Sequence, residues 1–135
     1  MYLLDTNIAS ELRRLRPHGA VLAWIESIPS ESMFLPAIAA GEIQIGIERT
    51  RKNDAEKAAE LSEWLRLLLT TSKWIAPGPE VFRIWGQLVE KRPALVVDAL
   101  IAATAMHHNM IVVTRNVRDF SNFDVGILNP FVYSP

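Results

Sequence analysis

The stretch Tyr-Leu-Leu-Asp-Thr-Asn, residues 2–7, opens the chain with a short apolar run that ends on an acid. A run of this kind, bounded by polar residues, is typical of a buried strand. Four further short or extended runs follow at Met33–Leu35, Lys73–Ala76, Ile111–Thr114 and Val125–Leu128. Longer segments with helical spacing of apolar residues separate them. Because strands that alternate with helices form parallel sheets, the sequence predicts an α/β fold with a mostly parallel central sheet.

Helices are expected between these strands. The predicted segments are Ser10–Leu15, Ala20–Ile28, Ile38–Arg51, a helix after Asn53, a helix beginning at Pro79, and Val97–His108. Thr6 or Asn7 is expected to cap the first helix. Asn53 is expected to cap the fourth, with Glu56 in the capping-box position.

The fourth helix carries an apolar stripe made by Leu61, Trp64, Leu65 and Leu68. Leu67 and Leu69 widen this stripe beyond what one buried face needs. Core packing is the simpler interpretation of the excess, and a dimer or partner interface is the alternative.

The composition is that of one globular domain covering residues 1–135, with 50% apolar and 21% charged residues. The absence of cysteine excludes disulfides, thiol catalysis and cysteine-based zinc sites. We expect a cytoplasmic protein without membrane contact, because no secretory signal and no membrane-length apolar run is visible.

The formal net charge of −1 does not by itself indicate a nucleic-acid binder. Setting four acids aside for a metal site, however, leaves 11 of the 15 acids against 14 basic residues. Two basic clusters stand out, one at Arg13, Arg14 and Arg16, the other at Arg49, Arg51 and Lys52. They are interpreted either as solvated helix faces or as contacts for RNA or a partner.

Four acids occupy positions where functional side chains gather in parallel sheets. Asp5 and Asp119 follow the ends of predicted strands, and Glu42 and Asp98 lie near the starts of predicted helices. Ligands bind beyond the carboxyl ends of parallel strands, so these acids are expected to meet at one edge of the sheet.

The surroundings of two of these acids are informative. Asp98 lies within a strongly apolar segment and shares a helix face with Ala102 and Ala105, which would let that helix approach the sheet closely. Gly41 and Gly46 flank Glu42, and a glycine inside a helix usually marks a close approach.

A buried carboxylate must pair with a base, take up a proton or bind a metal. Arg115 is the nearest base in sequence to this edge and could neutralise one acid, but not four. Converging carboxylates without bases favour a hard divalent cation such as Mg²⁺ or Mn²⁺. The three histidines show no metal-binding spacing, and His107 and His108 are expected at a helix C-terminus, where the dipole favours a cation. The four tryptophans fall mainly on apolar stripes, which favours core packing over base stacking, although Trp74 lies outside a clear pattern.

At this point the chain resembles the PIN-domain family, in particular the small VapC-like and FitB-like toxins of toxin–antitoxin pairs. The resemblance rests on five ordered motifs: Leu3–Asn7, Gly41–Ile43, Asp98–Ala105, Thr114–Phe120 and Asn129–Phe131. Any one of these motifs is weak, but the ordered set covers essentially the whole chain.

The resemblance implies a three-layer α/β/α sandwich and Mg²⁺- or Mn²⁺-dependent cleavage of RNA by a metal-activated water, giving a 5′-phosphate and a 3′-hydroxyl. It assigns the metal-binding and catalytic roles to Asp5, Glu42, Asp98 and Asp119. Asn7, Thr114 and Asn116 take supporting polar positions, and Arg115 would contact a phosphate or orient an acid.

The same resemblance implies a cognate antitoxin of the VapB or FitA kind as partner, with its C-terminal tail in the groove near the acids. It also implies a homodimer, and a larger hetero-oligomer with the antitoxin. One departure is that Ile38–Gly41 lacks the Ser or Thr that the family often has before the second acid, so a hydroxyl contact to Glu42 is expected to be missing.

Other classes fit less well. A haloacid-dehalogenase-like phosphatase also begins with an Asp at a strand end but needs a second Asp two residues later, where this chain has Asn7. A response-regulator receiver needs an Asp at a later strand end and a partner Lys, and neither stands out. A non-catalytic PIN-like module that binds protein or RNA remains the alternative, although such modules can lack acids that this chain retains.

Overall fold

The computed structural model describes residues 1–135 and contains five short strands in one sheet. The strands are β1 (Tyr2–Leu4), β2 (Met33–Pro36), β3 (Trp74–Ile75), β4 (Ile111–Val113) and β5 (Ile127–Leu128). They lie in the order β3-β2-β1-β4-β5, and every pair is parallel. The predicted parallel α/β sheet is therefore confirmed.

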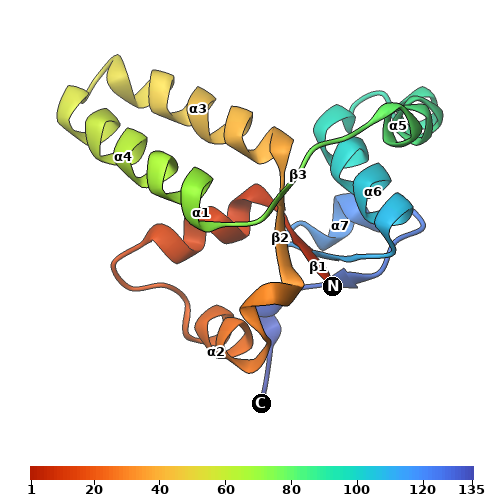
Figure 1. Ribbon diagram of the computed structural model, residues 1–135, viewed down its shortest axis with the longest axis horizontal. Helices are drawn as coiled ribbons and strands as arrows, with labels where there is room; N and C mark the ends of the chain where they lie inside the picture. The colour runs from red at the N-terminus through yellow and green to blue at the C-terminus, as the bar shows by residue number, and fades with distance from the viewer.

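Seven helices connect these strands (Figure 1). They are α1 (Thr6–Arg13), α2 (Gly19–Ser27), α3 (Ala37–Arg51), α4 (Ala55–Thr71), α5 (Pro79–Lys91), α6 (Val96–His108) and the short α7 (Val117–Phe120), with 3₁₀ turns at Ser30–Ser32 and Pro130–Val132. None of these helices combines the length and apolar character needed to cross a lipid bilayer.

The two faces of the sheet bury different sets of side chains, as the alternation of a strand requires. Leu3 and Val112 point into a cluster that α5 and α6 complete. Leu4 and Val113 point the other way, into a cluster with residues of α1 and α2. Each strand thus contributes to both layers, which produces the expected three-layer sandwich.

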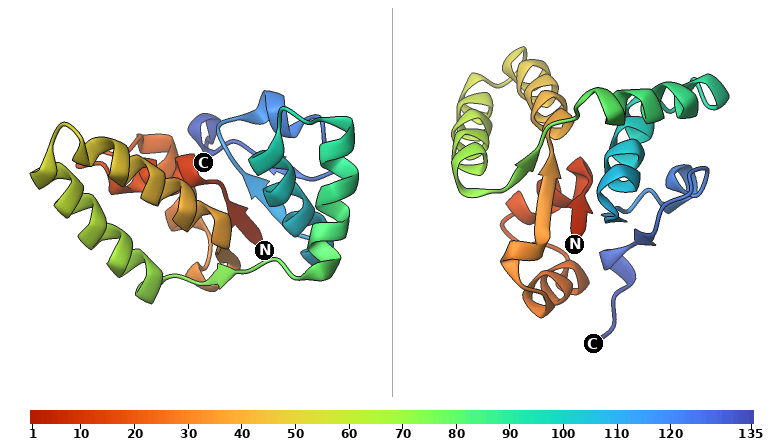
Figure 2. Two further views of the ribbon diagram at one scale, coloured as in Figure 1. Left: turned by 90° about the horizontal axis from the view of Figure 1, so that it is seen from above. Right: turned by 45° about the vertical axis from the view of Figure 1, so that its right-hand side comes forward.

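Helices α3 and α4 form a hairpin that extends to one side of the sheet, while α5 and α6 lie on the other side (Figure 2). The hairpin has its own small core of Ile43, Ile47, Ala58 and Leu65. Leu61, Trp64 and Leu68 pack against this core, which confirms the predicted stripe.

Leu67 and Leu69 do not join that core, because their side chains are 48% and 49% exposed. The core-packing interpretation of these two leucines is therefore wrong. Because both leucines lie on the outside of α4, a dimer or partner interface is the interpretation that remains.

Two predicted helix caps are also wrong by one or two residues. Asp5, rather than Thr6 or Asn7, caps α1, which ends at Arg13. Asp54, rather than Asn53, caps α4 by accepting a hydrogen bond from the Lys57 amide at 3.0 Å. The amides of Asn53 and Asp54 both donate to the Thr50 carbonyl at the end of α3, and only the Asp54 side chain reaches an amide of the first turn of α4.

The topology creates one place where connections leave the sheet in opposite directions. The chain moves from β1 to β2 and β3 on one side, and later returns to place β4 and β5 on the other. The boundary between β1 and β4 is therefore a topological switch point, where open parallel sheets form a crevice beyond the strand ends.

Candidate metal and active site

Asp5 lies at the switch point, immediately after β1, and only 6% of it is exposed. Its amide donates to the Val113 carbonyl, which fixes the residue between β1 and β4. One carboxylate oxygen accepts from the Thr6 amide at 2.8 Å. The other accepts from the Thr114 hydroxyl at 2.8 Å and from the Asn7 amide group at 3.2 Å. Burial raises the pKa of Asp5 in spite of these hydrogen bonds.

Glu42 lies in the second turn of α3, the helix that follows the neighbouring strand β2, and reaches the same region. The Thr6 hydroxyl donates to its carboxylate at 2.6 Å. The expectation that a hydroxyl contact to Glu42 is missing is therefore wrong, because α1 supplies the hydroxyl that the start of α3 lacks. Sequence reasoning overlooked Thr6 in this role because its 36-residue separation from Glu42 gives no local signal.

Asp98 lies in the first turn of α6, and Asp119 lies in α7. The Asn116 side-chain amide bridges them, donating to Asp98 at 3.2 Å and to Asp119 at 2.8 Å. Ala102 and Ala105 are buried against the sheet, so α6 does approach closely, as the small side chains predict.

The four carboxylates act on one another. The pKa of Asp98 is raised to about 6, first by burial and then by the negative charges of Asp5, Asp119 and Glu42. The structure thus brings together all four acids that the sequence singles out. These acids come from segments far apart in the chain, which Figure 1 shows as β1, α3, α6 and α7.

No base neutralises these acids. The three salt bridges of the molecule join Arg14 to Glu11, Arg51 to Glu48 and Arg66 to Glu63. Arg115 instead places its guanidinium 4.4 Å from the centre of the Phe131 ring, while its backbone amide donates to Asn7 at 3.4 Å. The Arg115 side chain therefore contacts none of the acids, and the expectation that it orients one of them is not supported by a contact.

The acids border a polar cleft of about 700 Å³ that has no apolar side chain in its lining. Its residues are Asp5, Thr6, Asn7, Ser10, Glu11, Arg13, Arg14, Glu42, Asp98 and Asn116. Asp119 is not part of this lining and reaches the cluster through Asn116. As the side chains stand, no three acidic or histidine side chains form a close ligand set for a metal ion.

Glu11 is a buried acid of this cleft that the sequence did not single out. Its carboxylate accepts from the His18 amide at 2.9 Å and from Arg14 at 3.3 Å. These contacts lower its pKa, with the His18 bond as the larger cause. The signal that could have found it is an acid on the same helix face as Ile8, which is fully buried.

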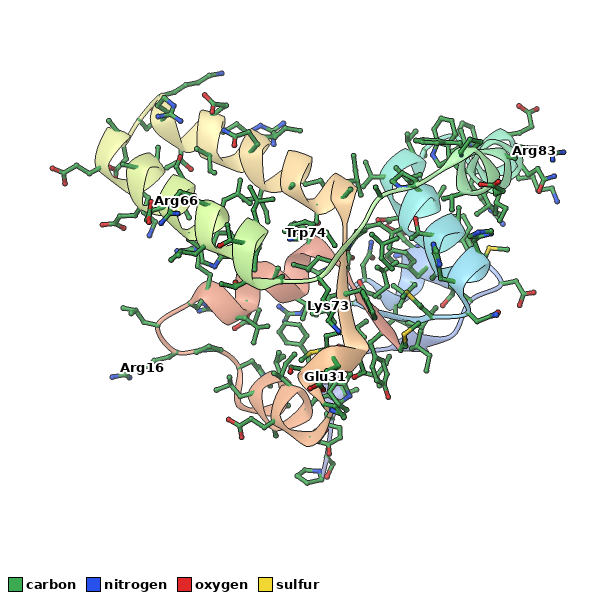
Figure 3. The ribbon with its side chains drawn as sticks, in the orientation of Figure 1. Arg16, Glu31, Arg66, Lys73, Trp74 and Arg83 are labelled. Atoms are coloured by element: carbon green, nitrogen blue, oxygen red, sulfur yellow. The ribbon has the colours of Figure 1, made fainter.

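Three other expectations concern residues that do not line the cleft. A Cβ atom added at Gly41 or Gly46 would meet nothing within 4 Å, so the predicted close approach at these glycines is wrong. Trp74 belongs to β3 and donates to the Leu68 carbonyl at 3.2 Å, and Figure 3 shows it beside Lys73 at the crossing between α4 and the sheet. This hydrogen bond joins β3 to the end of α4.

His107 and His108 occupy the last turn of α6, as expected.

A second cavity, of about 340 Å³, lies apart from the acids between α1, α2, β2 and α4. Apolar side chains such as Leu12, Ile25 and Trp64 form most of its wall, and none of the four acids reaches it. Its chemistry does not suit metal binding.

Comparison with known proteins agrees with this geometry. The family model of the PIN domain matches residues 2–126. The chain is 33% identical to Toxin FitB of Neisseria gonorrhoeae, over 97% of this chain and 99% of that protein. It is 30% identical to VapC ribonuclease Y4jK of Sinorhizobium fredii, over 97% of this chain and 98% of that protein.

The structure is similar to the crystal structure of FitAcB from Neisseria gonorrhoeae, with a TM-score of 0.83 and 31% identity. The match covers 98% of this chain and 99% of the other. Sequence and structure thus agree over almost the full length, and the chain belongs to the PIN domain family.

Proposed function

We propose that this PIN-domain chain is a metal-dependent endoribonuclease that acts as the toxin of a toxin–antitoxin pair. The observation that carries the proposal is the convergence of four acids, none of them paired with a base, around one polar cleft at the switch point of the sheet. The names of two relatives, a FitB toxin and a VapC ribonuclease, support the same activity. Because the substrate is RNA, we expect the activity in the cytoplasm.

Mg²⁺ or Mn²⁺ fits the donor set better than zinc, because the available ligands are carboxylate oxygens. Asp5, Glu42, Asp98 and Asp119 would hold the ion. Mg²⁺ usually keeps several water molecules, so carboxylates that surround it need not touch one another. This agrees with acids that converge without forming a close ligand set. When bound, the cation polarises the phosphate and lowers the pKa of a bound water.

The polar residues around the acids orient the carboxylates for this task. Thr114 and Asn7 hold Asp5, Asn116 holds Asp98 and Asp119, and Thr6 holds Glu42. Each of them donates a hydrogen bond to a carboxylate, which favours the ionised form that a metal needs. Since the cleft is open and lined by polar groups, a phosphodiester and its attacking water can both enter it.

The activity is tested with purified protein and a fluorophore-labelled RNA, with and without Mg²⁺ or Mn²⁺. Wild-type protein is expected to cleave only with the metal, and Asp5→Asn is expected to abolish cleavage while keeping the circular dichroism of the fold. Asp124→Asn is the matched control, because Asp124 is exposed and lies outside the cleft. Full activity of Asp5→Asn would contradict the role of Asp5.

The partner is proposed to be an antitoxin of the FitA or VapB kind, in a homodimeric or larger assembly. A structurally similar chain with 31% identity occurs in a structure of FitAB bound to a DNA fragment, which supports the proposal. Expression alone in bacteria is expected to be toxic, and co-expression of the neighbouring reading frame is expected to restore growth. Glu42→Gln should remove the toxicity, whereas Glu60→Gln on the exposed side of α4 should not.

The alternative is a non-catalytic PIN-like module that binds RNA or protein. It predicts harmless expression and no metal-dependent cleavage, although RNA binding would persist. The retention of all four acids in one cluster favours the nuclease.

A further inference from the structure

Two arginines line the cleft together with Asp5, Glu42 and Asp98 and pair with none of these acids. Arg13 is the last residue of α1 and Arg14 is its C-cap, and both line the cleft. In a cleft so rich in carboxylates, a free guanidinium would be expected to form an ion pair with the nearest acid. Neither arginine forms such a pair with Asp5, Glu42 or Asp98.

Each arginine is held by a partner of its own. Arg14 donates through one nitrogen to both oxygens of Glu11, at 3.3 and 3.4 Å. The guanidinium of Arg13 lies 5.9 Å from the centre of the Trp64 ring, on the hairpin formed by α3 and α4. Each guanidinium thus has a contact other than the acids proposed to bind the metal.

Glu11 is well suited to anchor Arg14. It is buried, and its bond to the His18 amide fixes it to the start of α2. The side chain of Arg14 is 63% exposed by contrast, and a guanidinium has five N–H donors of which the Glu11 contact uses one nitrogen. Most of its donors therefore remain free to bind a ligand in the cleft.

The lining of the cleft thus contains both kinds of charge, with the carboxylates of Asp5, Glu42 and Asp98 and the guanidinium groups of Arg13 and Arg14. The carboxylates suit a divalent cation, and the guanidinium groups suit an anion. A metal-bound phosphate would lie at the carboxylates, and the neighbouring phosphates of the same strand would lie at the guanidinium groups. Arginine is well suited to phosphate because its fork of donors binds two phosphate oxygens at once.

We propose that Arg13 and Arg14 bind the phosphates next to the cleaved one and so position a single RNA strand across the cleft. This inference rests on the proposed ribonuclease function and adds the residues that hold the substrate. It gives Arg13 and Arg14 a role that Arg16, the third residue of that basic cluster, does not share, because Arg16 does not line the cleft.

Other arginines provide controls because they point away from this region. Figure 3 shows Arg16 on the loop after α1, Arg66 on α4 and Arg83 on α5, each directed outward. Arg83 forms no salt bridge, so Arg83→Gln removes the same charge without breaking an ion pair. Arg16→Gln tests the neighbouring position on the same segment.

The test measures binding of a fluorophore-labelled oligouridylate by anisotropy between about 50 and 200 mM KCl, in the inactive Asp5→Asn background. Each single-strand phosphate contact contributes roughly 0.7 to the slope of log K against log salt. Arg13→Gln and Arg14→Gln are each expected to reduce the slope by about this amount and to weaken binding roughly fivefold at low salt. Arg83→Gln and Arg16→Gln are expected to leave the slope unchanged.

In the active protein, the same substitutions should raise KM several-fold and change kcat less than about twofold, because binding to remote phosphates is shared by the ground and transition states. Arg14→Lys keeps the charge and should restore the salt slope. It also guards against misfolding, since Arg14→Gln leaves the buried Glu11 without its cation.

The outcomes are distinct. If the protein cleaves RNA but Arg13→Gln and Arg14→Gln match Arg83→Gln in slope and KM, the phosphate assignment is overturned and the nuclease proposal stands. The phosphate assignment is likewise overturned if these variants lose only the binding of a protein partner. If the wild-type protein neither binds nor cleaves RNA, both proposals are overturned.

Discussion

Among the four acids, Asp98 has the pKa that its neighbours raise most clearly. Burial and three neighbouring acids raise its pKa to about 6. At neutral pH the carboxylate is therefore ionised although the negative charges of its neighbours repel it. A group with a raised pKa in the folded state binds protons more tightly there than in the unfolded chain. Proton binding by Asp98 therefore adds to the free energy of unfolding at low pH, and this gain is lost as the pH rises from about 4 through 6.

Asp98→Asn should consequently stabilise the metal-free protein at pH 8. After allowance for solvent screening we expect a gain of roughly 1 kcal/mol in the free energy of unfolding, and little gain at pH 4, where Asp98 keeps its proton. Urea denaturation at the two pH values measures this difference. Added Mg²⁺ should raise the melting temperature of the wild-type protein but not that of the variant, and equal responses would contradict a metal at Asp98.

Thr6 is a second residue whose role can be isolated. Thr6→Val keeps the shape of the side chain and removes the hydroxyl that donates to Glu42 at 2.6 Å. We expect kcat to fall about tenfold, since a lost hydrogen bond to a charged group corresponds to roughly 1.5 kcal/mol. Thr6→Ser should restore the rate, and Thr71→Val, on the exposed end of α4, serves as control. An unchanged kcat would remove Thr6 from the positioning of Glu42.

At the scale of elements, the hydrophobic periodicity of the sequence predicts every strand and the six longer helices, because burial on one face dictates that pattern. Boundaries follow from hydrogen bonds that periodicity does not contain. Asp5 caps α1 and Asp54 caps α4, because their carboxylates accept hydrogen bonds from amides of the first helical turn. Gly41 and Gly46 suggested close packing, yet open space surrounds both.

The reassigned cap of α4 makes a prediction at this scale. Asp54→Ala removes the carboxylate that accepts from the Lys57 amide and should cost about 1 kcal/mol in the free energy of unfolding. Asn53→Ala should change the stability by a few tenths of that, because the Asn53 side chain makes no capping bond. Chemical denaturation of both variants gives the comparison. A larger loss for Asn53→Ala would place the cap where the sequence pattern placed it.

At the scale of the whole molecule, the order of the strands explains how acids from four distant segments reach one place. Strand-end placement alone predicts that Asp5 and Asp119 share an edge, and the parallel topology extends this to Glu42 and Asp98. The Thr6 contact, the role of Glu11 and the tethering of Arg13 and Arg14 could not be predicted in this way. They depend on how α1 packs against the hairpin of α3 and α4, which tertiary packing decides rather than local sequence.

The pairing of β1 with β4 has a consequence during synthesis. The hydrogen bond from Thr114 to Asp5 joins residues 109 positions apart, and the Asn116 bridge to Asp98 and Asp119 follows it in the chain. A nascent polypeptide whose residues 114–119 are still inside the ribosome cannot assemble the proposed active site. We therefore expect no RNA cleavage by the growing polypeptide until residues 114–119 have emerged and folded against β1.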